Sequence, residues 1–203
     1  MTEGYIKFNC IWNQEEFQFQ EKVFDMLELS RTQLYALGLI GMNRDGIGFG
    51  NISVRNGESG SFIISGSATG GFARLNQSHY ALVRDYDFMD NSVSCSGLTK
   101  ASAESLTHAA VYESLPEVGA VVHVHCLWLW EKLLDIYPTT SAEIEYGTPE
   151  MADAVGKLAS GINSGEEKII VMGGHQEGIL AFGSNLDEAT TQIINIYNRY
   201  KND

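Results

Sequence analysis

One short stretch of the chain is apolar, rich in valine, and carries two histidines at its end: Val118-Gly119-Ala120-Val121-Val122-His123-Val124-His125. A short run of this kind predicts a buried strand. Because alternate side chains of a strand point to opposite faces, both imidazoles point the same way, with their Cα atoms about 7 Å apart. Such a pair can bind one metal ion, although two surface histidines on a half-buried strand would give the same pattern.

A third imidazole for the same ion is available elsewhere in the chain. His175 lies in a glycine-rich turn, Gly173-Gly174-His175-Gln176-Glu177-Gly178, whereas His79 is expected at the surface. Three neutral imidazoles that leave one position open form a common catalytic zinc site. We therefore predict that His123, His125 and His175 hold a divalent metal ion.

Expected helices and strands alternate along the rest of the chain, which favours a layered α/β fold. A length of 203 residues suits one domain, residues 1–203, with its own core. Helix-start signals are clearest at Ser102, Thr148-Pro149 and Asn185. Besides the histidine strand, the expected strands span residues 51–55, 62–64, 81–83, 92–95, 168–172 and 178–182, and the expected helices span residues 16–37, 102–115, 127–134, 148–160 and 185–201.

The chain carries 13 basic and 26 acidic residues, a formal charge of -13. A surface of that sign repels phosphate backbones and anionic lipids, so we expect neither nucleic-acid nor membrane binding. The sequence has no signal-peptide pattern and no apolar stretch of about 18 residues, so we expect a cytoplasmic protein. The three cysteines, Cys10, Cys95 and Cys126, show no CxxC spacing, and Cys126 is expected to be a core thiol.

A glutamate near the start of the expected 102–115 helix is a candidate catalytic group. Glu104 complements the helix dipole there, which alone would explain its presence. If that helix end faces the histidine strand, Glu104 could also ligate the metal and act as a general base once substrate displaces it. His108, one helical turn later, is expected to be a packing or hydrogen-bonding partner of Glu104.

Two segments rich in glycine and small residues, 43–50 and 65–71, are expected to be loops. Their backbone N–H groups could surround an anion, because glycine permits a tight, concave backbone. Ordinary turns would have the same composition. Neither segment has the GxxxxGK[ST] spacing of a phosphate-binding loop or the GxGxxG spacing of a dinucleotide site.

Taken in chain order, from about Leu34 to Tyr200, these motifs resemble the class II aldolase/adducin family, in particular its fuculose-phosphate aldolases. The motifs that carry the resemblance are Tyr35-Ala36-Leu37-Gly38-Leu39-Ile40, Gly50-Asn51-Ile52-Ser53-Val54-Arg55, the Ser65 to Gly71 loop, Ser102-Ala103-Glu104, His123-Val124-His125 and Gly174-His175. The resemblance implies a three-layer α/β/α domain around a mostly antiparallel central sheet. It also implies a cyclic homotetramer with active sites between subunits.

The resemblance further implies an enzyme that works on a sugar phosphate. A metal that chelates a hydroxy-ketone withdraws charge and stabilises an enediolate while a carboxylate moves the proton. We predict a lyase that cleaves a small phosphorylated hydroxy-carbonyl sugar; a sugar-phosphate dehydratase, a 4-epimerase and a non-catalytic adducin-like interaction module are the alternatives. The implied site consists of Zn2+, or Mn2+, Co2+ or Fe2+, on His123, His125 and His175, of Glu104 as the catalytic acid/base, and of Asn51, Thr69, Gly70 and Ser102 around the substrate phosphate.

The chain departs from the family pattern beside two of these residues. The paired serines expected before the glutamate are here Ser102 and Ala103, so one hydroxyl for the phosphate is missing. The third histidine is followed by Gln176 and Glu177 rather than by glycine, which adds a carboxylate near the site. Glu177 is therefore a second candidate for moving protons.

A third departure concerns a tyrosine. In the fuculose enzyme a neighbouring subunit supplies a catalytic tyrosine, but the segment 138–147 of this chain is short. Tyr137 and Tyr146 are the candidates for that role. With these differences, fuculose phosphate itself is not the expected substrate.

Overall fold

A computed structural model of the chain describes residues 5–57 and 60–201. Every helix and strand expected from the sequence is present, and three short strands within the first 50 residues and one 3-10 helix are added; one of these strands falls within the expected loop 43–50. The helices are α1 (Glu21–Ala36), the 3-10 helix η1 (Gln77–His79), α2 (Ser105–Ser114), α3 (Leu127–Leu133), α4 (Pro149–Gly161) and α5 (Leu186–Tyr200). The strands are β1 (Asn9–Asn13), β2 (Gly41–Met42), β3 (Gly48–Phe49), β4 (Asn51–Arg55), β5 (Phe62–Ser65), β6 (Tyr80–Asp87), β7 (Ser92–Ser96), β8 (Ala120–His125), β9 (Ile169–Val171) and β10 (Gly178–Gly183).

Eight of the strands form one sheet in the order β1-β7-β6-β5-β4-β8-β10-β9. The sheet is mixed: β1 and β7 are parallel, whereas the other neighbouring strands are antiparallel. The histidine strand β8 lies between β4 and β10 and is buried along its whole length. Burial on both faces explains why β8 is almost continuously apolar before its two histidines.

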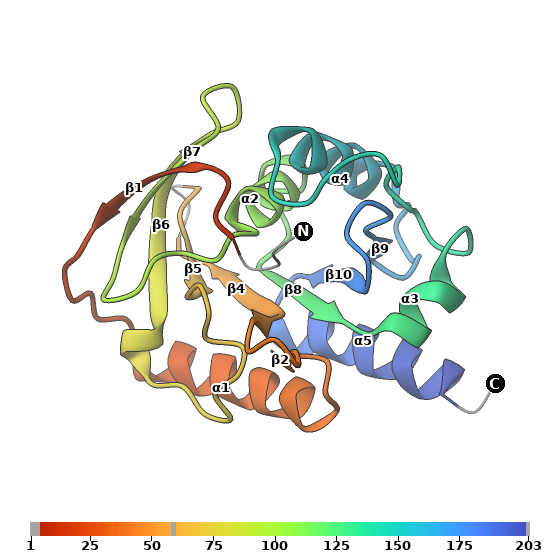
Figure 1. Cartoon of the computed structure of the whole chain (residues 1–203), viewed down its shortest axis with the longest axis horizontal. Helices are drawn as coiled ribbons and strands as arrows, with labels where there is room; N and C mark the ends of the chain where they lie inside the picture. The colour runs from red at the N-terminus through yellow and green to blue at the C-terminus, as the bar shows by residue number, and fades with distance from the viewer. Residues whose placement is uncertain (1–4, 58–59, 202–203) are drawn as a thin grey trace.

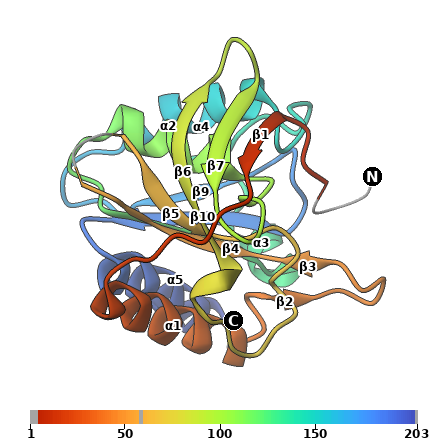
Figure 2. The same ribbon diagram turned by 90° about the vertical axis from the view of Figure 1, so that its left-hand side faces the viewer.

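Helices lie on both sides of this sheet (Figures 1 and 2). Helices α1 and α5 run along one face, and α2 and α4 pack on each other over the opposite face. The buried apolar side chains form one cluster for each face. Leu34 and Ile193 belong to the first cluster, and Leu106 and Val155 belong to the second. No helix among the described residues combines the length and the apolar content needed to span a membrane.

The first helix is shorter than its apolar spacing predicts, because α1 begins at Glu21 rather than near residue 16. The preceding residues are held by aromatic contacts instead. Phe17 stacks on Phe19 with ring centroids 5.4 Å apart, and Phe19 meets the buried Tyr80 edge-on at 5.9 Å. Packing of these rings against the core outweighs local helix propensity.

The helix expected from Ser102 also begins later, at Ser105, so the prediction of Ser102 as its N-cap is wrong. The Ser102 carbonyl instead accepts a hydrogen bond from Ser105 N at 3.1 Å, and its Oγ accepts one from Glu104 N at 3.3 Å. Glu104 therefore occupies the N-cap position with φ -91° and ψ 12°, a sparsely populated conformation in which active-site residues are often found. This turn directs Glu104 toward the histidine strand.

Candidate metal centre

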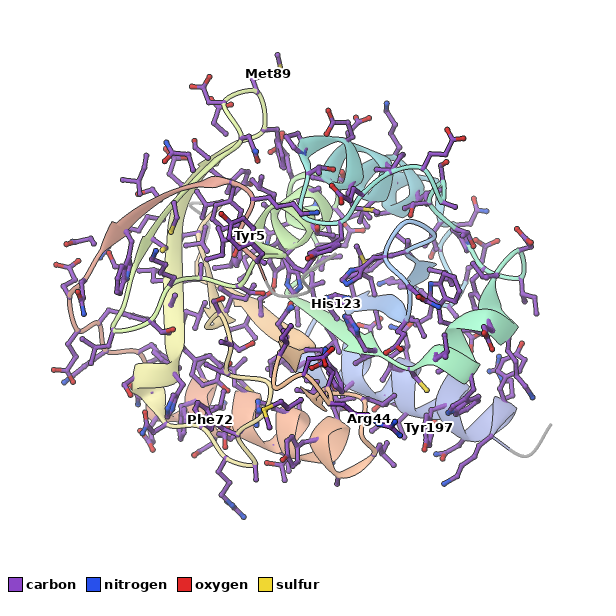
Figure 3. The ribbon with its side chains drawn as sticks, viewed as in Figure 1. Tyr5, Arg44, Phe72, Met89, His123 and Tyr197 are labelled. Atoms are coloured by element: carbon purple, nitrogen blue, oxygen red, sulfur yellow. The ribbon has the colours of Figure 1, made fainter. Side chains whose placement is uncertain are left out.

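Two neighbouring segments bring three histidines together near the middle of the molecule, where Figure 3 labels His123. His123 and His125 share one face of β8, and His175 lies in the turn between β9 and β10. The ring centroids are 4.8 Å apart for His123 and His125, 5.1 Å for His123 and His175, and 4.7 Å for His125 and His175. One nitrogen of each ring lies within 4.8 Å of the others, a spacing that one metal ion could bridge after slight closure of the rings.

The glycine-rich turn is built to hold His175 at this point. His175 N donates a hydrogen bond to Met172 O at 3.1 Å, and Gly178 N donates one to His175 O at 2.9 Å. A Cβ atom on Gly174 would collide with the backbone carbonyl of Ile144. The turn can therefore pack this closely on the preceding loop only with glycine at position 174.

The environment of His123 favours the neutral imidazole, which is the form that binds metal. His123 is 1% exposed, and burial lowers its pKa well below the usual value, with further lowering from His125 and His175. Its Nε2 atom has no hydrogen-bond partner among residues 5–57 and 60–201. A buried nitrogen left in this way costs free energy unless a ligand or water satisfies it.

Glu104 supplies an acidic group at the edge of the triad. Its Oε1 atom lies 3.9 Å from His175 Nδ1, and its Oε2 atom accepts a hydrogen bond from Thr107 Oγ1 at 2.8 Å. The carboxylate is only 4% exposed, and Oε1 accepts no hydrogen bond from the described part of the chain. Thr107 therefore fixes one oxygen of Glu104 while the other remains available to a ligand.

The triad and Glu104 line one small cavity of about 40 Å³. The four residues predicted to hold a phosphate border the same cavity, and they are Asn51, Thr69, Gly70 and Ser102. Ala103 also lines it, which leaves one hydroxyl fewer than the family pattern has. The residues predicted to hold the substrate and those predicted to bind a metal therefore line one cavity.

Aromatic rings limit how far two of the imidazoles can turn. Phe49 stacks on His125 with ring centroids 5.3 Å apart, and Tyr146 stacks on His175 at 4.4 Å. Lys7 Nζ lies 3.8 Å above the Tyr146 ring and donates a hydrogen bond to Tyr146 O at 2.7 Å. The Tyr146 ring therefore contacts both an ammonium group and the imidazole of His175.

Several expectations about neighbouring residues need correction. His108 does not pair through its ring with Glu104; its Nδ1 lies 2.7 Å from Ser53 Oγ, and burial lowers its pKa to about 3. Of the two candidate tyrosines, Tyr146 lines the cavity, whereas Tyr137 donates its hydroxyl to Glu167 on the surface. Glu177 is near the site in sequence, but the described lining of the cavity does not include it.

The sequence analysis missed a buried cation behind the cavity. Arg31 of α1 is 1% exposed, and its Nη2 atom donates to the carbonyl oxygens of Thr69, Gly70 and Phe72 at 3.0, 3.0 and 2.6 Å. Its spacing could have revealed it, because Arg31 falls between Leu27 and Leu34 on the apolar face of the helix. The guanidinium fixes the loop that lines one wall of the site.

We expect Arg31→Met to lower the free energy of unfolding by about 3 kcal/mol, since three carbonyls would lose a charged donor. Urea titration followed by circular dichroism measures this change. Arg74→Met, an exposed arginine in the same region, is the matched control and should change stability by less than about 0.5 kcal/mol. Equal effects of the two substitutions would show that Arg31 does not support the loop.

The sequence model of the Class II Aldolase and Adducin N-terminal domain matches residues 36–201. The chain belongs to this family. The match includes the three histidines, Glu104 and the four predicted phosphate positions. Class II aldolases use a divalent metal ion, and the buried triad could bind one.

Solved structures agree with the family fold. L-fuculose-1-phosphate aldolase from Thermus thermophilus is 21% identical, with a TM-score of 0.66 over 88% of this chain and 91% of that one. YgbL from Escherichia coli, a candidate aldolase/epimerase/decarboxylase, is 17% identical, with a TM-score of 0.64 over 88% and 86%. A sugar-phosphate aldolase from Thermotoga maritima is 17% identical, with a TM-score of 0.62 over 88% and 93%. No curated protein sequence matches the chain.

Proposed function

We propose that this chain is a divalent-metal-dependent lyase that cleaves a small phosphorylated hydroxy-carbonyl compound by a retro-aldol reaction. The proposed metal ligands are His123, His125 and His175. The observation that carries the proposal is the shared cavity, in which the buried triad, Glu104 and a loop of small residues face one another. An interaction module has no physical need for this set of groups in a buried cleft.

The proposed acid/base is Glu104, because one of its oxygens is held by Thr107 while the other lies 3.9 Å from His175 Nδ1. A bound divalent ion would withdraw charge from the substrate's hydroxyl and carbonyl oxygens and so stabilise an enediolate. Glu104 would take the proton of the reacting hydroxyl as the carbon–carbon bond breaks and would then donate a proton to the enediolate carbon. Because the carboxylate is 4% exposed, bulk water competes little for that proton.

The proposed phosphate end of the cavity lies at the loop of Thr69 and Gly70, and Asn51 and Ser102 line the same cavity. A Cβ atom on Gly70 would come within 2.6 Å of Gly41 O and Phe49 N, so the backbone approaches its neighbours too closely for any other residue. The Arg31 charge behind this loop would favour an anion despite the acidic surface. These contacts would position the substrate rather than react with it.

Product analysis tests the reaction type. We expect zinc- or manganese-loaded protein to convert a panel of ketose phosphates into two carbonyl fragments, which mass spectrometry detects directly. Loss of one water would instead favour the dehydratase, and an unchanged mass with inverted stereochemistry would favour the epimerase. Failure to bind any transition metal would contradict the enzyme proposal and favour the interaction module.

The family resemblance also supports a homotetramer, which light scattering would detect as four times the mass of one chain.

A further inference from the structure

Two of the three cysteines meet at the edge of the sheet, away from the histidine triad. Cys10 lies on the edge strand β1 and Cys95 on its parallel neighbour β7, and their Sγ atoms are 3.9 Å apart. In the strand register Cys10 is opposite Val93 and Cys95 is opposite Trp12, so the two cysteines are offset by two residues and share one face. The family match begins at residue 36, so Cys10 lies outside it.

The surroundings of the pair suit thiol chemistry. Cys95 is 1% exposed, and the hydrogen bond that it shares with Cys10, together with the Ala101 N–H and the Lys100 charge, lowers its pKa against the opposing effect of burial. The same hydrogen bond raises the pKa of Cys10, so the pair favours one thiolate beside one thiol, and either sulfur can be the donor. A thiolate is the form of cysteine that attacks other sulfur or peroxide atoms.

We propose that Cys10 and Cys95 are a redox modification site, at which a hydroperoxide converts the two thiols into a reversible disulfide. In the first step one sulfur attacks the peroxide, the O–O bond breaks, and a sulfenic acid and one water form. In the second step the other sulfur attacks the sulfenic sulfur, the S–S bond forms, and the hydroxyl leaves as water with the remaining thiol proton. Two thiols are oxidised and one hydrogen peroxide is reduced to two waters.

The position of β1 makes this reaction feasible. Alternate residues of β1 are exposed, and Cys10 between them is half-buried, so a water-sized oxidant can approach the pair from the sheet edge. Figure 1 shows β1 along the outside of the sheet, where it has β7 as its one neighbour in the sheet. The diagonal placement of the two cysteines means that the backbone must move to bring the sulfurs from 3.9 Å to bonding distance, which an edge strand can do more easily than a central strand.

The disulfide would fix two contacts that lead toward the metal centre. Lys7 lies three residues before Cys10, and its ammonium contacts the Tyr146 ring that stacks on His175. Ala101, whose N–H bonds to Cys95, directly precedes Ser102 of the cavity. The proposal itself concerns the two sulfurs and is independent of the function proposed for the cavity.

The test is oxidation of the folded full-length protein with a small excess of hydrogen peroxide, followed by intact-mass measurement and thiol titration. We expect the wild-type chain to lose about 2 Da and its thiol count to fall from three to one, with both changes reversed by dithiothreitol. A proteolytic digest without reductant should contain one linked peptide pair that includes residues 10 and 95. These readouts require neither metal nor substrate, so they remain informative even if the lyase proposal fails.

Cys10→Ser and Cys126→Ser provide a matched comparison, because both replace a half-buried cysteine. Cys126→Ser should still lose about 2 Da, whereas Cys10→Ser should not. Addition of oxygen to the wild-type chain without loss of two hydrogens would overturn the proposal. So would a linked pair that contains residue 126, or the same 2 Da loss in Cys10→Ser.

Discussion

Replacing His123 by alanine is expected to abolish metal binding and turnover together. His123 is 1% exposed, and its neutral ring contributes one of only three imidazoles that the described residues bring together at the centre. Loss of an outer hydrogen bond to a metal ligand already weakens metal affinity by about 10- to 100-fold. Removal of a ligand itself should weaken metal affinity by more than this factor, so the purified variant should contain essentially no transition metal.

Elemental analysis and thermal unfolding together measure this effect. Saturating zinc should stabilise the wild-type protein by about 2.7 kcal/mol when its concentration is 100 times the dissociation constant, and it should leave His123→Ala unchanged. His79→Ala is the control, because His79 is a half-buried histidine of η1 outside the triad, where its ring contacts Phe72. Comparison of the metal-free proteins separates lost binding from a folding defect. A variant that retains stoichiometric metal would contradict the assignment of His123 as a ligand.

The fold could be predicted where capping residues and apolar spacing in the sequence agree with the burial that the structure shows. Thr148 and Asn185 cap their helices as expected, with Thr148 Oγ1 accepting from Met151 N at 3.2 Å and Asn185 Oδ1 accepting from Glu188 N at 2.9 Å. Strand β1 was missed because five residues that alternate between exposed and half-buried positions resemble a loop without the partner strand in view. The parallel pairing of β1 with β7 depends on residues more than 80 positions away, which no local pattern records.

The site was predictable to the extent that it consists of chemically distinctive residues. The histidines, Glu104 and the small-residue loops could be named from motifs, and the structure brings them to one cavity. Lys7 could not be named, because its contact with Tyr146 joins parts of the chain 139 residues apart. Arg31 could have been suspected from its place on an apolar helix face, but its three carbonyl acceptors follow only from the tertiary fold.

Glu104→Gln should lower kcat by about 10²- to 10⁴-fold while the bound metal content stays unchanged. Glutamine keeps the shape of the side chain and can still accept the Thr107 hydrogen bond, but it cannot take up a proton. The proton step can be measured without knowledge of the natural substrate. Dihydroxyacetone phosphate, a minimal phosphorylated hydroxy-ketone, is incubated in deuterated water, and the exchange of its carbon-bound hydrogen is followed. NMR should show exchange catalysed by the wild-type protein and almost none by the variant.

Thr107→Val separates proton transfer from positioning of the carboxylate. Valine has nearly the shape of threonine but cannot donate to Glu104 Oε2, which lies 2.8 Å from Thr107 Oγ1. If Thr107 positions the carboxylate, Thr107→Val should lose less exchange activity than Glu104→Gln. The carboxylate remains in Thr107→Val, but no hydrogen bond from residue 107 orients it. If Glu104→Gln retained most of the exchange activity, another group would have to move the proton. Glu177 would then be the next residue to replace, because it carries a carboxylate and lies two residues after His175 in the sequence.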